Sequence, residues 1–158
     1  MSSVPTSTKG LADEALPDDP QALAELTART MYANDAASQA LGAHVVSMAP
    51  GQASMSMAVR ADMLNGHKTC HGGFIFALAD STFAFACNSR NAATVAAGCT
   101  IDYLAPAFEG DVLIAHAIEY SLSGRTGIYD VQVTDQDGKR IAIFRGRSYR
   151  IKGQVVGG

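Results

Sequence analysis

One apolar run in the middle of the chain constrains the fold more than any other feature. Residues 74–87 read FIFALADSTFAFAC, and Asp80 is the only charged side chain among them. This run is shorter than the roughly 20 apolar residues that span a bilayer. We therefore expect a core helix from Gly72 to about Ser89. Because this helix is apolar nearly all round, other elements must cover it on all sides.

The overall composition is that of a globular domain and excludes several classes of protein. The 158 residues fit one domain, in which 47% of residues are hydrophobic and 17% are charged. With 12 Lys and Arg against 15 Asp and Glu, and no Trp, the chain lacks the features of a nucleic-acid-binding protein. Three cysteines form no closed disulfide framework, and Met1–Pro20 contains no apolar signal segment. We therefore expect a cytoplasmic protein without membrane attachment.

Turn signals and changes of hydrophobic period place the other elements. Asp19 can cap a helix whose first residue is Pro20, and Gly42 can end a second helical piece over 35–41. A turn at Pro50 and Gly51 predicts a hairpin. Two later strands are indicated by apolar residues of one parity, Val95, Cys99, Ile101 and Tyr103 in the first and Val112, Ile114, Ile118 and Tyr120 in the second.

These elements predict an α+β domain over residues 20–152, in which six antiparallel strands curl around the apolar helix. The outer face of such a sheet still carries apolar residues, so one chain leaves an edge or a face for a partner, and we expect a homo-oligomer. The remaining predicted segments are a disordered tail (1–19), strands over 43–49, 52–60, 127–135 and 140–151, an irregular loop (61–71) and a C-terminal tail (153–158).

Asp80 is the first candidate for chemistry. An ionised carboxylate inside an apolar helix is costly unless it is paired or hydrogen-bonded, and burial raises its pKa. A raised pKa suits a general base or a nucleophile. Alternatively, Asp80, Ser81 and Thr82 mark a helix break or cap, where Asp80 bonds to the local backbone.

The second candidate is the segment NGHKTCHGG, residues 65–73. Gly72 and Gly73 stand where a loop becomes a helix, so another group can approach the backbone closely, and the first N–H groups of the helix point outward. Such donors can form an oxyanion hole. Alternatively, the two glycines only allow a tight helix start against the sheet.

Two other interpretations of the same segment are weaker. His67, Cys70 and His71 are metal-ligand types, but the remaining His and Cys residues show no paired spacing, so we expect no metal site and no cofactor. Cys70 is a weak candidate nucleophile, because the adjacent His71 rarely faces it productively and no orienting group stands out.

Helix geometry restricts how the two candidates cooperate. Gly72 and Asp80 are eight residues apart, which is about 12 Å along a helix. A nucleophile must lie about 3 Å from the carbonyl whose oxygen the donors hold. Asp80 therefore cannot serve Gly72 of its own chain, and the two meet across a subunit interface if they act together.

The run LNGHKTCHGGFIFALADSTFAFACNS, with CTIDYLAP and FRGRSYRI downstream, resembles the hotdog-fold acyl-CoA thioesterases of the phenylacetic-acid-degradation (PaaI) type. The resemblance covers about residues 28–155 and implies a six-stranded sheet around a central helix, in dimers that pair into a tetramer. It implies that Asp80 is the catalytic carboxylate, as nucleophile or as general base. It further implies that the Gly72 N–H polarises the thioester carbonyl, and that His71 and Asn65 shape the loop.

The resemblance also implies that Asp80 and the His71-Gly72 loop of one site come from different subunits. The implied reaction is hydrolysis of phenylacetyl-CoA, or a hydroxylated or otherwise ring-modified form of it, to the acid and CoA. Two alternatives remain: a hotdog hydratase or dehydratase acting on acyl thioesters, and a non-catalytic acyl-CoA-binding module.

Charge is distributed unevenly along the chain. From Arg125 onward there are seven Lys and Arg against three acids, a surface that could meet the phosphates of coenzyme A. Exposure of these side chains on solvated strand faces explains many of the charges equally well. Arg145 and Arg147 share one parity, so they could line the same face of a strand. We name Arg125 and Thr126 as candidate phosphate contacts, and Gly73 and Ser81 as further candidate substrate contacts.

Overall fold

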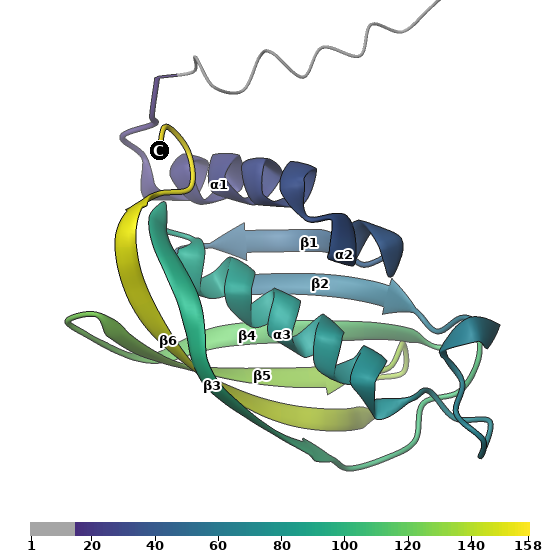
Figure 1. The fold of residues 1–158 in the computed structure, drawn as a ribbon. Helices are drawn as coiled ribbons and strands as arrows, with labels where there is room; N and C mark the ends of the chain where they lie inside the picture. Colours follow the sequence, from purple (N-terminus) through teal and green to yellow (C-terminus); the bar gives the residue numbers. More distant parts are fainter. Residues whose placement is uncertain (1–14) are drawn as a thin grey trace, which may run out of the picture.

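A curved antiparallel sheet wraps one long helix (Figure 1). The computed structural model describes residues 15–158, and within them six strands follow the order β1-β2-β4-β5-β6-β3. The predicted α+β class and hotdog arrangement are confirmed. The elements are α1 (Pro20–Asn34), α2 (Ala36–Ala40), β1 (His44–Ala49), β2 (Gln52–Ala58), a 3-10 turn (Ala61–Met63), α3 (Gly72–Asn88), β3 (Ala92–Tyr103), β4 (Val112–Ser123), β5 (Thr126–Thr134) and β6 (Arg140–Gln154).

The two N-terminal helices begin at the capping residues that the sequence indicates. The Asp19 carboxylate accepts a hydrogen bond from the Ala22 N–H at 2.8 Å, and Pro20 opens α1. Asp35 caps α2 in the same way, accepting from the Ser38 N–H at 2.9 Å. Gly42 follows α2 with a φ of 69°, a left-handed conformation that suits glycine. The predicted helix boundaries are confirmed here.

The core forms between α3 and the concave face of the sheet. On α3, Leu78, Ala79, Phe83 and Ala86 are fully buried. Each buried Leu or Phe contributes about 1.5–3 kcal/mol to the folding free energy. The sheet contributes alternate side chains to the same core, Met55, Met57, Leu113, Ala115, Ala117, Val131 and Val133.

The opposite, convex face of the sheet carries the apolar residues that the sequence predicts on its outer side. On β4, Val112, Ile114, Ile118 and Tyr120 are between 38% and 72% exposed. They alternate with the residues that pack on α3, as the pleat of a strand requires. A single chain therefore presents an apolar convex surface.

A β-bulge divides strand β3, which corrects the expectation that its apolar residues share one parity. The register with β6 shifts between Ala96 and Gly98, so Val95 pairs with Tyr149 whereas Cys99 pairs with Gly146. Directly paired residues present their side chains to the same face. Tyr149 is exposed on the convex face, whereas Gly146 lies against the Phe83 ring of α3. Val95 and Cys99 therefore face opposite sides, because the extra residue reverses the alternation.

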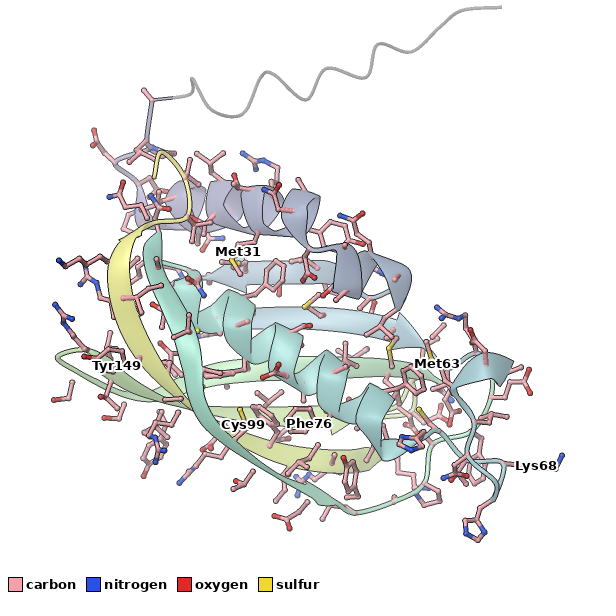
Figure 2. All side chains as sticks on the ribbon, in the orientation of Figure 1. Met31, Met63, Lys68, Phe76, Cys99 and Tyr149 are labelled. Carbon is pink, nitrogen blue, oxygen red and sulfur yellow. The ribbon has the colours of Figure 1, made fainter. Side chains whose placement is uncertain are left out.

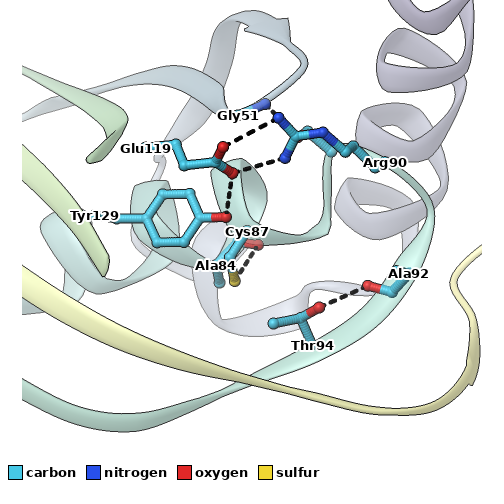
Figure 3. A network of polar contacts seen from close by, with 9 residues as sticks. Gly51, Ala84, Cys87, Arg90, Ala92, Thr94, Glu119 and Tyr129 are labelled. Atoms are coloured by element: carbon cyan, nitrogen blue, oxygen red, sulfur yellow. Dashed lines mark hydrogen bonds and ion pairs between the residues drawn. The ribbon is translucent and has the colours of Figure 1, made fainter. Parts of the chain in front are cut away.

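Polar contacts fasten the C-terminal end of α3 to the sheet (Figure 3). Arg90 donates to Glu119 of β4 at 2.6 Å, and the Tyr129 hydroxyl of β5 donates to the same carboxylate at 2.8 Å. The Gly51 N–H, in the β1–β2 turn, donates to the Ser89 hydroxyl at 2.7 Å. The β1–β2 turn and Glu119 of β4, which lie side by side, are thereby tied to one helix terminus.

The chain ends differ in how far they join the domain. Most of the predicted N-terminal tail, residues 1–14, lies outside the described residues. The predicted C-terminal tail is not fully separate, because β6 extends to Gln154 and Val156 is buried. The Asn91 side chain accepts hydrogen bonds from the backbone N–H groups of Val155 and Val156. Across residues 15–158, none of the helices combines the length and the apolar character needed to cross a membrane.

The packing of Phe83 on Gly146 can be tested by adding one methyl group. A Cβ atom at Gly146 would lie 2.7 Å from the Phe83 ring, so we expect Gly146→Ala to lower the free energy of unfolding by about 1–3 kcal/mol. Gly98→Ala is the matched control, because there the new Cβ meets only the mobile end of Arg147. Urea unfolding curves measure both variants, and equal midpoints would contradict the packing argument.

Candidate active site

Asp80 lies half-buried on α3, where its carboxylate meets a thiol from β3. Cys99 Sγ donates to Asp80 Oδ1 at 3.7 Å, and within residues 15–158 this is the one hydrogen bond that reaches the carboxylate. Burial raises the pKa of Asp80, and the hydrogen bond from Cys99 opposes that rise. Few hydrogen bonds and a raised pKa are features of a carboxylate that acts as general base or nucleophile.

The two polar residues after Asp80 have separate partners. Ser81 shares a hydrogen bond of 3.1 Å with Ser38 of α2. Thr82 is fully buried and donates to the Leu78 carbonyl at 2.7 Å, one turn back along the helix. Since α3 is continuous from Gly72 to Asn88, the alternative that these residues break or cap a helix is wrong.

The loop before α3 is organised by Asn65. Its side-chain oxygen accepts from the His67 N–H at 2.9 Å and from the Thr69 N–H at 3.2 Å, and its side-chain amide donates to the Thr69 hydroxyl at 3.0 Å. Two strand-like contacts hold the base of the loop, an isolated bridge between Leu64 and Cys70 and a bond from the Cys70 N–H to Ala107. The segment predicted as an irregular loop is thus a closed, internally bonded turn.

His71 caps α3 and determines which backbone donor stays free. Its Nδ1 accepts from the Gly73 N–H at 2.9 Å, which requires the neutral tautomer with its proton on Nε2. In the described part of the chain, the Gly72 N–H has no hydrogen-bond partner. A free N–H in the first turn of a helix is a preformed donor for a carbonyl or oxyanion.

Cys70 is poorly arranged for nucleophilic attack. Its side chain is buried, and burial raises the pKa of the thiol. The thiol donates to the carbonyl of His71 at 3.7 Å rather than to the imidazole ring. The geometry therefore does not support a Cys70–His71 pair.

Tyr103 is a contact of this site that the sequence did not indicate. From the end of β3, its hydroxyl donates to the carbonyl of Gly72 at 2.9 Å. A Cβ atom at Gly72 would lie 2.9 Å from the tyrosine ring, so the ring occupies the space that any larger residue would need. The only sequence signal was the glycine itself, which indicates that some group approaches the backbone closely.

Comparison with known proteins assigns the family. A family model described as "Thioesterase superfamily" matches residues 67–142. Acyl-coenzyme A thioesterase PaaI of Escherichia coli (strain K12) is 50% identical over 130 residues, which cover 82% of this chain and 93% of that protein. The chain belongs to the thioesterase superfamily.

Solved structures agree with this family. The structure of the E. coli PaaI protein from the phenylacetic acid degradation operon superposes with a TM-score of 0.85 at 48% identity, covering 86% of this chain and 99% of that one. A more distant structure, a Streptococcus mutans UA159 protein bound to acetyl CoA, has a TM-score of 0.67 at 25% identity and covers 70% and 89% of the two chains. The hotdog fold of this thioesterase-superfamily chain is thus also that of its relatives.

The candidate phosphate contacts lie far from the Gly72 loop. Arg125 and Thr126 stand at the β4–β5 turn, which lies at the opposite end of the molecule from the loop before α3 (Figure 1). Arg125 lines a cavity of about 170 Å³ together with Arg90 and Arg150. Within one thioesterase-superfamily chain, these residues and Gly72 do not form one site.

Other polar groups of the family domain are engaged elsewhere. Arg145 forms an ion pair with Asp130 at 2.7 Å and lies over the Tyr120 ring.

Among residues 15–158 no three His, Cys, Asp or Glu side chains are grouped to hold a metal ion. A hollow of about 620 Å³ between α1 and β1 contains none of the predicted site residues.

The contact between Gly72 and Tyr103 predicts a strict size limit at the start of α3. In Gly72→Ala the new methyl group would push the tyrosine ring or the backbone N–H out of place, and we expect kcat/KM for thioester hydrolysis to fall about 10- to 100-fold. Gly66→Ala in the preceding loop is the control, because a Cβ there meets open space. Equal activities of the two variants, measured by thiol release, would argue against the limit.

Proposed function

We propose that this protein hydrolyses acyl-CoA thioesters to the free acid and coenzyme A, and that its substrate is phenylacetyl-CoA or a ring-modified form such as hydroxyphenylacetyl-CoA. One observation carries the proposal: a half-buried, weakly bonded carboxylate lies on the same helix, α3, as a helix-start N–H that has no partner among residues 15–158. The relative named acyl-coenzyme A thioesterase PaaI and the structure bound to acetyl CoA support the substrate class.

The Gly72 N–H would donate to the thioester carbonyl oxygen, whose negative charge grows in the transition state. Asp80 would then act in one of two ways. As a general base it takes a proton from water, whose oxygen adds to the carbonyl carbon while the C–S bond breaks. As a nucleophile it adds to that carbon itself, and water hydrolyses the resulting anhydride. Both routes release the thiolate of coenzyme A, which takes up a proton, and the free acid.

We infer that one active site uses Asp80 of one subunit and Gly72 of another. About 12 Å of helix separates the two residues within a chain. Strand β3 supports the pairing of two chains, because it forms an edge of the sheet, with backbone groups free to pair. The apolar convex face supports a second contact, so we propose a dimer of dimers.

We further propose that the protein works in the cytoplasm. The support is its chemistry: all three cysteines, at positions 70, 87 and 99, are free thiols, as is typical of a reducing compartment.

Removal of the Asp80 carboxylate tests its chemical role. We expect Asp80→Ala to lower kcat for phenylacetyl-CoA about 10²- to 10⁴-fold, the usual contribution of a positioned general base, and to leave acyl-CoA binding nearly unchanged. A thiol reagent follows release of coenzyme A, and calorimetric titration with a non-hydrolysable analogue measures binding. The matched control is Asp102→Ala, an exposed carboxylate on β3, which should retain wild-type turnover.

Full turnover in Asp80→Ala would contradict the assignment. The same assay separates the alternatives, because a hydratase would consume an unsaturated acyl-CoA without releasing thiol and a binding module would release none. A panel of aryl- and alkyl-acyl-CoAs ranked by kcat/KM tests the acyl group, and an aliphatic preference would contradict the phenylacetyl proposal.

The shared site predicts complementation between two defective chains. Asp80→Ala and Gly72→Ala homo-oligomers should each be weak, whereas a mixed dimer contains one intact site. Random mixing gives about half mixed dimers with one of two sites intact, so co-expression should recover about a quarter of wild-type activity. The purified mixture, compared with each variant alone, gives the measurement. No recovery in a sample with demonstrated mixed oligomers would place the site within one chain.

A further inference from the structure

Cys99 is aimed at α3 by the bulge in β3. Without the register shift between Ala96 and Gly98, Cys99 would share the face of Val95, which is on the convex side. With the shift, Cys99 pairs with Gly146, and its half-buried side chain packs against the core. Figure 2 shows Cys99 beside the middle of α3. Bulges next to active sites commonly redirect a side chain in this way.

The thiol of Cys99 is the donor in its contact with Asp80. Burial, followed by the negative charge of Asp80, raises the pKa of Cys99 to about 11. The sulfur therefore keeps its proton at neutral pH and donates it to Asp80 Oδ1 at 3.7 Å. In the part of the chain that the structure describes, Oδ2 makes no hydrogen bond. One oxygen is therefore held, and the other is left free.

Other carboxylates of this protein are held far more firmly. Asp130 bonds to Arg145 at 2.7 Å, and that hydrogen bond lowers the pKa of Asp130. Glu119 bonds to Arg90 and Tyr129, and these bonds outweigh burial and lower its pKa. A guanidinium stabilises the charged carboxylate strongly and makes it a poor base. A thiol is a weak donor, so it can orient a carboxylate without making it inert.

We propose that Cys99 is a positioning residue for Asp80: its thiol holds Oδ1 so that Oδ2 faces the acyl carbon or the attacking water. The inference rests on the catalytic role proposed for Asp80. No Lys, Arg or His of residues 15–158 bonds to this carboxylate. Among residues 15–158, the titratable groups that interact with this carboxylate are Cys99 on β3 and Cys87 on α3.

The test uses two variants without a donor at position 99, one smaller and one larger than cysteine, and a third variant that has a hydroxyl donor instead. In Cys99→Ala and Cys99→Val we expect kcat to fall roughly 3- to 10-fold with KM unchanged. The Cys99 hydrogen bond stabilises the ionised carboxylate, so its removal raises the pKa of Asp80 further, and the acidic limb of the kcat/KM profile should move to higher pH. The loss should then be about 2- to 5-fold greater on that limb than on the plateau. Cys99→Ser restores a donor and should return both values toward wild type.

Cys87→Ala is the matched control. The Cys87 thiol is also buried in the core, but it donates to the Ala84 carbonyl at 3.4 Å and not to Asp80. The pH profile of Cys87→Ala should therefore stay that of the wild type. Thermal unfolding and gel filtration establish that each variant folds and assembles. A wild-type profile in Cys99→Ala and Cys99→Val, or a Cys99→Ser that behaves as they do, would overturn the inference.

Asp80→Ala, measured in the same series, separates two kinds of failure. Full turnover in Asp80→Ala would overturn the proposed function, and the role of Cys99 with it. An inactive Asp80→Ala beside unaltered Cys99 variants would overturn only the positioning role.

Discussion

The need to bury the large apolar side chains of α3 determines most of this structure. Leu78 and Phe83 of this helix are fully buried, and a flat layer would cover them less completely than a curved one. The sheet therefore curls, and its concave residues alternate with an equally apolar convex set on β4. The curled sheet thus leaves a second apolar surface outside, and this surface is the one on which we propose that a partner chain packs.

The same burial raises the pKa of Asp80 at a cost in stability. Because burial raises its pKa in the folded protein, the folded chain binds this proton more tightly than the unfolded chain does. The carboxyl therefore favours folding most at pH values below its ordinary pKa, and that contribution is lost as the pH rises through the raised value. At neutral pH the ionised Asp80 therefore lowers the free energy of unfolding compared with an apolar residue at the same position.

Local signals predicted much of the fold, and long-range pairing accounts for what they missed. Asp19 with Pro20, the Pro50-Gly51 turn and the apolar run each act within a few residues, so the elements that they mark were predictable. The bulge in β3 depends on its register with β6, which no pattern within β3 encodes. In the site, Asp80 and Gly72 stood out by their chemical type and by the family resemblance. Cys99 and Tyr103 contact Asp80 and Gly72 only because strand pairing brings β3 beside α3.

The contact between Tyr103 and Gly72 also bears on how such a chain can change over time. The tyrosine ring fills the space beside the glycine, and its hydroxyl bonds to the glycine carbonyl. A larger residue at 72 therefore requires a smaller one at 103, and a smaller residue at 103 leaves the start of α3 without its brace. The two positions, 31 residues apart in the sequence, are therefore coupled: a change at either one alters the space and the hydrogen bond available to the other.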